Sequence, residues 1–158
     1  MQEERFKVRV TVGGIVEKEG KILVVRQPIH PEKTGPKITI TQPAGHVEEN
    51  ETLEQALLRE VKEESGYTVR PTALIGVYFR PWQNSPSLRF SYVCELTDDL
   101  VVPLTDINIL EALWMPIEEV KTRRSEYRSG STEITFDDYF AGKRYPLELI
   151  KCFEKIRS

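Results

Sequence analysis

The stretch GHVEENETLEQALLREVKEESGY, which runs from Gly45 to Tyr67, decides how the surrounding chain is organised. A turn signal, QPAG, precedes it, and Gly66 suits the position directly after a helix. Thr52 with Gln55 three residues later forms a capping box, so we predict one helix between these two turns. Its inward side chains, which recur at helical spacing, are Leu53, Ala56, Leu57 and Val61.

Three carboxylates continue the buried face of this helix. At about 100° per residue, Glu60, Glu63 and Glu64 fall in one sector that overlaps the direction of the apolar side chains. Ionised side chains that face a core are unfavourable unless they are paired or bind a metal, and like charges three and four residues apart repel each other. Hard oxygen donors from one helix turn, joined by the backbone carbonyl of Gly45, suit Mg²⁺ or Mn²⁺ better than zinc.

The other explanation for a Glu-rich helix is a solvated acidic face held by Lys62 and Arg59, and the spacing of the stretch favours the metal site instead. That spacing resembles the signature of the Nudix hydrolases, the Nudix box. Tyr67 stands where the signature usually has an aliphatic residue, and a large apolar ring can still pack there. The matching positions are Gly45, Glu51, Arg59, Glu60, Glu63, Glu64 and Gly66.

The resemblance implies a fold and a metal site. The fold is an α/β (α+β) one, the Nudix α/β/α sandwich with a mixed β-sheet, and the strands expected on both sides of the central helix agree with it. In the metal site that the resemblance implies, Glu60 and Glu64 are the principal ligands, while Glu63 and the carbonyl of Gly45 support them. The cofactor is then Mg²⁺, with Mn²⁺ as an alternative.

The resemblance also assigns catalytic roles. Hydrolysis of a diphosphate requires charge neutralised on the phosphoryl oxygens, a nucleophilic water, and correct alignment of the two. Family members differ in the residue that deprotonates the water, and we place Glu60 or Glu63 ahead of any residue outside the Nudix box. Arg59 is expected to pair with Glu51 and so to fix the loop against the helix.

Three segments are similar to one branch of the family, the NudJ-type phosphatases: QPAGHVEENETL around the Nudix box, LRF at 88–90, and GKRYPLELI at 142–150. These enzymes act on nucleoside di- and triphosphates and on the pyrophosphates of thiamine and its hydroxymethylpyrimidine precursor. The resemblance thus implies a Mg²⁺-dependent hydrolase of a small phosphorylated substrate. Two alternatives stay open: another Nudix specificity, such as ADP-ribose or damaged nucleotides, and a nucleotide-sensing module that binds without turnover.

Candidate site residues outside the Nudix helix rest on shorter signals. Arg26 at a strand end and Arg89 in LRF are candidates to bind phosphate, because a guanidinium matches phosphate oxygens bidentately. Glu111 stands where related enzymes often carry a further acid, and His46 directly follows the first glycine of the Nudix box. Tyr145 is a candidate to close the pocket. Each has an ordinary alternative at the surface or, for Tyr145, in the core.

Composition limits the class of protein. The 158 residues suit one domain, 1–158, and the net charge of −3 with a pI near 5.6 disfavours binding to nucleic acid or to an anionic membrane. No apolar run is long enough to span a membrane, and no signal peptide is recognisable. Cys94 and Cys152 fit no metal or redox motif, so we expect core or boundary residues in a reducing cytoplasm. Monomer and homodimer both remain open.

The other elements follow from alternation and from turn residues. We expect a loop over 27–37, irregular chain over 97–109 because of its Asp and Pro residues, and an exposed segment over 121–132. Strands are expected over 6–17, 21–26, 38–41, 68–80, 88–96 and at 112–115. Helical segments are expected after Pro116, over 134–140, and as a final amphipathic helix from Pro146 to Ile156.

Overall fold

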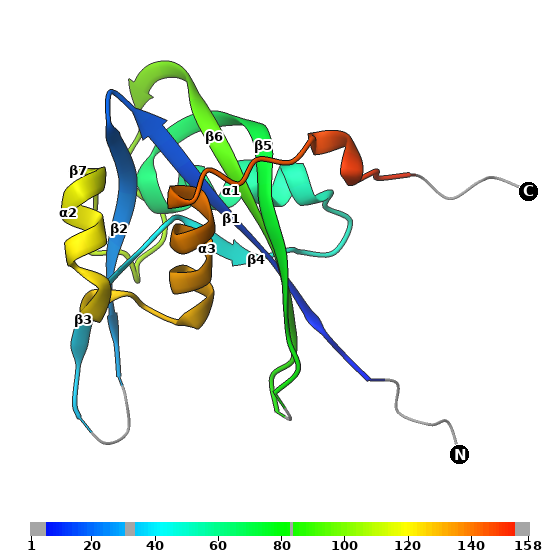
Figure 1. The fold of residues 1–158 in the computed structure, drawn as a ribbon, viewed down its shortest axis with the longest axis horizontal. Helices are drawn as coiled ribbons and strands as arrows, with labels where there is room; N and C mark the ends of the chain where they lie inside the picture. The colour runs from blue at the N-terminus through cyan, green and yellow to red at the C-terminus, as the bar shows by residue number, and fades with distance from the viewer. Residues whose placement is uncertain (1–5, 31–33, 83, 154–158) are drawn as a thin grey trace, which may run out of the picture.

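The computed structural model describes residues 6–30, 34–82 and 84–153 and has a mixed sheet with helices on both faces (Figure 1). The strands are β1 (Arg9–Lys18), β2 (Lys21–Ile29), β3 (Lys37–Thr41), β4 (Ala44–His46), β5 (Tyr67–Arg80), β6 (Ser87–Val101) and β7 (Glu111–Pro116). The helices are α1 (Leu53–Ser65), α2 (Ile117–Thr122) and α3 (Gly130–Phe140), with 3₁₀ turns η1 (Arg124–Glu126) and η2 (Leu147–Leu149). The predicted α/β class is therefore confirmed. Within the described part of the chain, no helix has the length and apolar character needed to cross a membrane.

The sheet divides at β1. This strand pairs in parallel with β6, starting with Arg9 opposite Ser87, and β6 pairs in antiparallel fashion with β5. On its other side β1 meets β2 only at its end, where Glu17 lies opposite Ile22, and the two strands run apart from there (Figure 1). β2 continues into an antiparallel group with β3 and β7. β4 pairs with the earlier part of β1, so the first glycine of the Nudix box lies where the two groups of strands separate.

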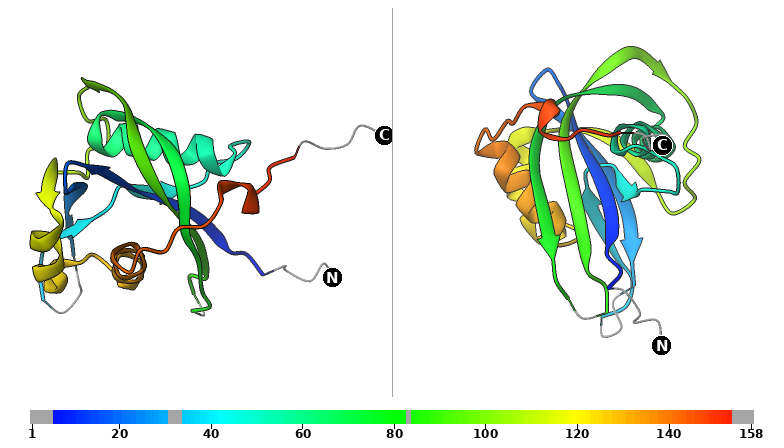
Figure 2. Two further views of the ribbon diagram at one scale, coloured as in Figure 1. Left: turned by 45° about the horizontal axis from the view of Figure 1, so that its top comes forward. Right: turned by 90° about the vertical axis from the view of Figure 1, so that its right-hand side faces the viewer.

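Two hydrophobic cores lie on opposite faces of the sheet. Alternate side chains of β1 serve both, because Val16 packs towards α1 while Ile15 packs towards α3. Ala56, Leu57 and Val61 of α1 are fully buried in the first core. Phe136 and Tyr139 of α3, with Val120 of α2, fill the second core. Figure 2 shows α1 and α3 on the two sides of the strands, which is the predicted α/β/α arrangement.

Helix α1 begins and ends as its local sequence predicts. The Thr52 hydroxyl accepts from the backbone N–H of Gln55 at 3.1 Å, and the Gln55 side chain accepts from the backbone N–H of Thr52 at 2.9 Å. Gly66 follows the helix with a φ of 77°, and its N–H donates to the Lys62 carbonyl at 2.8 Å. A Cβ at Gly66 would lie 2.0 Å from the carbonyl oxygen of Val102, so both backbone angle and space require glycine.

Several strands are longer than their sequence signals indicate. β2 extends to Ile29 and β3 begins at Lys37, so both ends of the expected 27–37 loop are strand, while residues 31–33 lie outside the described residues. β6 runs through Asp98 and Asp99 to Val101, where we expected irregular chain. Asp98 and Asp99 fall at a register shift between the pairs Tyr67–Val101 and Val69–Leu96, and Asp99 forms an ion pair with Lys18 at 2.8 Å. The pairs on both sides of this shift therefore carry the strand past residues of weak strand propensity.

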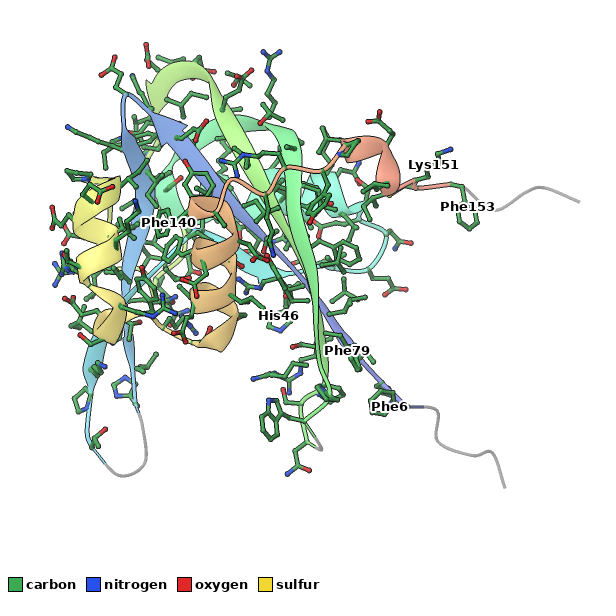
Figure 3. All side chains as sticks on the ribbon, viewed as in Figure 1. Phe6, His46, Phe79, Phe140, Lys151 and Phe153 are labelled. Atoms are coloured by element: carbon green, nitrogen blue, oxygen red, sulfur yellow. The ribbon has the colours of Figure 1, made fainter. Side chains whose placement is uncertain are left out.

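The predicted C-terminal helix is wrong over its described part. Only the single turn η2 forms, and residues 151–153 have no regular structure. Leu74 of β5 exchanges two backbone hydrogen bonds with Tyr145, at 2.9 and 2.7 Å, which ties the segment to the sheet edge as extended chain. Phe153 is 88% exposed and stands clear of the sheet (Figure 3), so it contributes to no buried helix face. Cys94 is buried as expected, whereas Cys152 is exposed. Residues 154–156 of this prediction lie outside the described residues.

Candidate functional site

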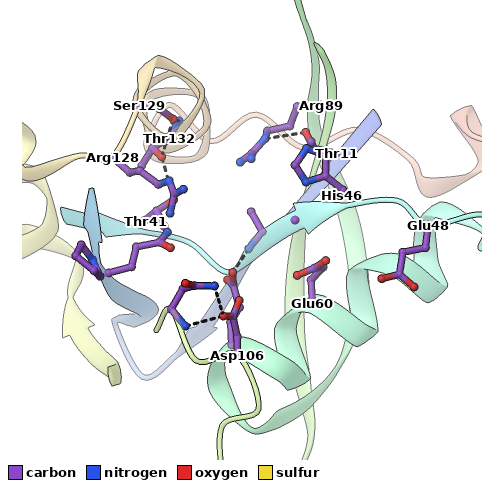
Figure 4. A pocket seen from close by; sticks show the side chains of 16 residues that line it. Thr11, Thr41, His46, Glu48, Glu60, Arg89, Asp106, Arg128, Ser129 and Thr132 are labelled. Carbon is purple, nitrogen blue, oxygen red and sulfur yellow. Dashed lines mark hydrogen bonds between the residues drawn. The ribbon is translucent and has the colours of Figure 1, made fainter. Parts of the chain in front are cut away.

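A cavity of about 500 Å³ lies beside the turn at Gly45, where β1 and β2 separate (Figure 4). Helix α1 contributes the carboxylates of Glu60 and Glu64 to its wall, and the loop before β7 contributes Asp106. Arg89 of β6 and Arg128 at the start of α3 lie on the side away from Glu60 and Asp106. The other lining residues are Thr11, Gln27, Pro28, Thr41, Ala44, Gly45, His46, Glu48, Asn108, Ser129 and Thr132.

Glu64 is the most deeply placed of the acidic side chains. It is 5% exposed, and its Oε2 accepts a hydrogen bond from the backbone N–H of Ala44 at 2.9 Å. The pKa of Glu64 is raised to about 8, mainly by burial and in addition by the neighbouring charges of Glu60 and Asp106, against the opposing effect of the Ala44 hydrogen bond. A buried carboxylate in this electrostatic environment needs either a proton or a cation.

Glu60 explains why the turn must carry glycine. A Cβ built at Gly45 would lie 2.1 Å from the carboxylate carbon of Glu60, so any larger residue would occupy the space of that carboxylate. Oε1 of Glu60 accepts from Nη1 of Arg59 at 2.7 Å. Burial also raises the pKa of Glu60, although the Arg59 hydrogen bond opposes that shift. The Glu60 carboxylate is thus packed against the glycine backbone, at the cavity wall.

Arg59 connects helix α1 to the loop that precedes it, as predicted. Its Nε and Nη2 donate to the two carboxylate oxygens of Glu51 at 2.6 and 2.9 Å, and Nη2 also donates to the His46 carbonyl at 2.9 Å. The bidentate Arg59 contact lowers the pKa of Glu51 to about 2. The predicted ion pair is therefore present, and it fixes the chain on both sides of the Nudix box loop.

One member of the predicted acidic cluster lies outside the cavity. Glu63 does not line the cavity, because its side chain is 41% exposed and lies 3.3 Å from Nη1 of Arg59. Asp106, which we had regarded only as a strand breaker, lies at the cavity instead. Backbone hydrogen bonds from Thr105 and Asp106 to the Glu63 carbonyl, at 3.1 and 3.2 Å, hold its loop against the end of α1. The inward acids are thus Glu60, Glu64 and Asp106.

These donors fit a hard divalent cation by chemistry. Two carboxylates from adjacent helix turns, a third from a loop, and the carbonyl of Gly45 form an all-oxygen set of the kind that Mg²⁺ and Mn²⁺ prefer. Over residues 6–30, 34–82 and 84–153, no three acidic, histidine or cysteine side chains are gathered closely enough to hold an ion as they stand. Oε1 of Glu60 accepts from Arg59, so coordination through that oxygen would require it to leave Arg59, whereas Oε2 is not held by Arg59.

The opposite wall carries positive charge. Nε of Arg89 donates to the Thr11 hydroxyl at 3.3 Å, while Nη1 is buried without a hydrogen-bond partner among the described residues. Burial lowers the pKa of Arg89 to about 10 and so leaves it charged at neutral pH. Arg128 also lines the cavity and makes no ion pair within the described ranges. Of the two arginines that we predicted to bind phosphate, only Arg89 is at the cavity.

The other predicted residues are divided between the cavity and the surface. His46 lines the cavity. Arg26 does not, because its guanidinium bonds to the carboxylate of Glu111, which lies opposite it in the β2–β7 pairing. Tyr145 lies at the edge of β5, beside Leu74. Arg26, Glu111 and Tyr145 are therefore not among the residues that line this cavity.

Sequence reasoning missed the polar groups that line the far wall. Arg128, Ser129 and Thr132 belong to a stretch that we expected to be an exposed segment, although Thr132 is only 1% exposed. A usable signal was present, because Ser129 is an N-cap residue whose side chain accepts from the backbone N–H of Thr132. That signal predicts where α3 begins but not what its first turn faces.

Comparison with known proteins agrees with this geometry. Residues 6–135 match the NUDIX domain family. Phosphatase NudJ from Shigella boydii serotype 4 (strain Sb227) and from Escherichia coli (strain K12) are each 36% identical to this chain over 151 residues. Each match covers 94% of this chain and 94% of the relative. The solved NUDIX hydrolase from Nitrosomonas europaea has a TM-score of 0.81 and 32% identity, covering 93% of this chain and 98% of its own. The NUDIX domain of Shewanella oneidensis NrtR, complexed with ADP ribose, has a TM-score of 0.66 at 15% identity over 87% of this chain and 90% of its own, a likeness of fold alone.

Proposed function

This chain belongs to the Nudix hydrolases and is similar to Phosphatase NudJ, and from that premise we propose that it hydrolyses small organic di- or triphosphates with Mg²⁺. The proposed substrates are nucleoside di- and triphosphates and the pyrophosphates of thiamine or hydroxymethylpyrimidine, and Mn²⁺ is the proposed substitute for Mg²⁺. We take residues 1–158 as one domain. The supporting observation is the cavity itself, which has carboxylates on one side and the guanidinium groups of Arg89 and Arg128 on the other.

In this proposal Glu64, Glu60 and Asp106 hold the ion, together with the carbonyl of Gly45. A bound divalent ion neutralises phosphoryl charge and lowers the pKa of water. The hydrogen bond from Ala44 orients Glu64, at 2.9 Å, before any ion arrives. Arg59 acts as a positioning residue, because its hydrogen bonds hold the Glu60 side chain and the loop at Glu51 in fixed positions relative to each other.

The proton acceptor that we propose is Glu60 rather than Glu63. Both carboxylates were candidates from the sequence, but only Glu60 lines the cavity in which a substrate phosphate would lie. Arg89 would bind a phosphoryl oxygen, because its Nη1 is an unpaired donor at the cavity wall. His46 would contact the substrate beside the Gly45 turn.

Release of phosphate or of a nucleotide tests the proposal. The purified protein is incubated with GDP, GTP, thiamine pyrophosphate, ADP-ribose and dinucleoside polyphosphates, in Mg²⁺, in Mn²⁺ and in EDTA. We expect turnover of at least one di- or triphosphate, and loss of that turnover in EDTA. A preference for ADP-ribose would change the proposed substrate but leave the proposed hydrolase activity in place. Calorimetric binding of these compounds without any product would overturn the proposed reaction.

A further inference from the structure

Two buried hydrogen-bond donors without partners face the same point beside Gly13. A Cβ built on Gly13 would lie 3.3 Å from Nη1 of Arg89 and 3.3 Å from Nε2 of Gln42. Neither nitrogen has a hydrogen-bond partner in the described part of the chain. Gln42 is 0% exposed, so its amide cannot turn to bulk water. A buried donor left unpaired is unfavourable and rare, which makes two at one point a sign of a missing acceptor.

A series of hydroxyl groups agrees with the orientation in which the NH₂ end of Gln42 faces that point. Thr41 donates its hydroxyl hydrogen to Oε1 of Gln42 at 3.1 Å, so the contact between Thr41 and Thr132 at 2.9 Å must use the hydrogen of Thr132. Ser129 lies 3.3 Å beyond Thr132 in the same series. Because the Gln42 oxygen is occupied by Thr41, its NH₂ group is directed to the Gly13 side.

The point lies directly behind residues of the cavity wall, since Gly13 and Gln42 are not themselves among the lining residues. Arg89 lines the cavity and Ala44, whose Cβ is 3.4 Å from the same point, lines it too. Arg128 adds a second cationic side chain on this wall (Figure 4). The charge here is positive, and the donors are nitrogens only. The acceptor that best matches two converging N–H groups, one of them cationic, is an anionic oxygen.

We propose that Gly13, Gln42 and Arg89 form an oxyanion-binding subsite for a phosphoryl group of the substrate that lies on the side away from the carboxylates, with Arg128 completing its charge. The inference rests on the proposed function, because the ligand is part of the same di- or triphosphate. It deepens that function by adding residues outside the Nudix box. Gly13 contributes by having no side chain, which leaves room for the oxygen.

Binding of methylenediphosphonate, a diphosphate analogue with a carbon bridge, tests the subsite directly. Calorimetry is carried out in saturating Mg²⁺ on the full chain and on Gly13→Ala, whose methyl group would lie 3.3 Å from both nitrogens and so crowd an oxygen that approaches them. We expect the Kd for the analogue to rise at least about tenfold, because one charge-assisted and one neutral hydrogen bond are lost. Gly130→Ala is the matched control, because a Cβ there meets nothing within 4 Å. It should leave Kd unchanged.

A second variant guards against misfolding of the first. Gln42→Glu keeps an acceptor for Thr41 but replaces the donor by a carboxylate, so analogue binding should again fall at least about tenfold. Binding of Mn²⁺, followed by electron paramagnetic resonance, should stay within twofold in both variants. Unchanged analogue binding in Gly13→Ala and Gln42→Glu would overturn the subsite, as would a bound structure with only water between Arg89 and Gln42.

The subsite and the proposed reaction can fail separately. If the protein turns over no substrate, yet Gly13→Ala weakens analogue binding, the subsite stands and the hydrolase proposal fails. If turnover is normal and the variants bind the analogue as the parent chain does, the hydrolase proposal stands and the subsite fails. In an active enzyme, Gly13→Ala should raise KM for a diphosphate more than it lowers kcat.

Discussion

Replacing Glu64 by Gln should stabilise the metal-free protein and abolish its stabilisation by metal. Glu64 is 5% exposed and its pKa is raised from 4.5 to about 8. Because the native pKa lies above the unfolded one, the contribution of this group to stability is fully present below pH 4.5 and is lost as pH rises through about 8. Gln keeps the acceptor for the Ala44 N–H without the charge.

The size of the effect follows from the two pKa values. At about 1.4 kcal/mol per pH unit, the proton that Glu64 keeps in the folded state and loses in the unfolded state lowers the free energy of unfolding by roughly 3 kcal/mol near pH 7, and the loss levels off at roughly 4 to 5 kcal/mol near pH 9, where the folded side chain ionises as well. Around pH 4 the parent chain and Glu64→Gln should differ little from this cause. The variant should therefore gain stability over the parent as pH rises, in EDTA.

Urea unfolding at these pH values, in EDTA and again in excess Mg²⁺, measures both effects. With Mg²⁺ the parent chain should recover stability at neutral and alkaline pH, since the ion binds the ionised carboxylate. The variant should show almost no response to the ion. If Glu64→Gln is less stable than the parent in EDTA near pH 9, or still responds to Mg²⁺, then Glu64 is not a buried metal ligand.

The turn, the loop and the helix cap of the Nudix box give three further predictions. Gly45→Ala should weaken Mn²⁺ binding at least about tenfold, because its Cβ would lie 2.1 Å from the Glu60 carboxylate carbon; a paramagnetic resonance titration within twofold of the parent would contradict this. Glu51→Gln should lower the free energy of unfolding by about 1 to 2 kcal/mol at neutral pH through loss of the Arg59 pair, and the difference should shrink as pH falls from 4.5 towards about 2, where the parent loses the same interaction; equal urea midpoints at pH 7 would refute it. Thr52→Ala should lower the free energy of unfolding by about 1 kcal/mol by removing the helix cap, while leaving kcat unaltered. Coincident unfolding curves of the variant and the parent chain would contradict this role of Thr52.

Local signals explain what the sequence could predict. Helix α1 has its cap, its apolar stripe and its terminal glycine within one short segment, and each of these acts on the backbone next to it. The pairing of Arg59 with Glu51 was predictable because the Nudix box fixes both positions. The orientation of Glu63 was not, because a sector calculated at about 100° per residue does not separate the centre of a face from its rim. Glu63 lies on that rim, within reach of Arg59.

Residues brought in by tertiary structure could not be found in this way. Asp106 reaches the cavity only because its loop bonds to the end of α1 through the Glu63 carbonyl. Arg128 reaches it because its backbone N–H donates to the Ile40 carbonyl of β3 at 3.1 Å. The C-terminal segment failed for a related reason, since two hydrogen bonds between Tyr145 and the edge strand outweigh its apolar periodicity.

The separate origin of the two walls has an evolutionary consequence. The carboxylates Glu60 and Glu64 come from one continuous stretch of chain and Asp106 from the loop before β7, whereas Arg128 and Ser129 come from the connection between α2 and α3, which bridges to β3 at Tyr127 and Ile40, and Thr132 comes from the first turn of α3. Under the proposed function, descendants of this protein could therefore exchange one di- or triphosphate for another through changes in that connection, without altering the carboxylates. Grafting the connection of a relative with a different substrate should transfer preference and preserve turnover.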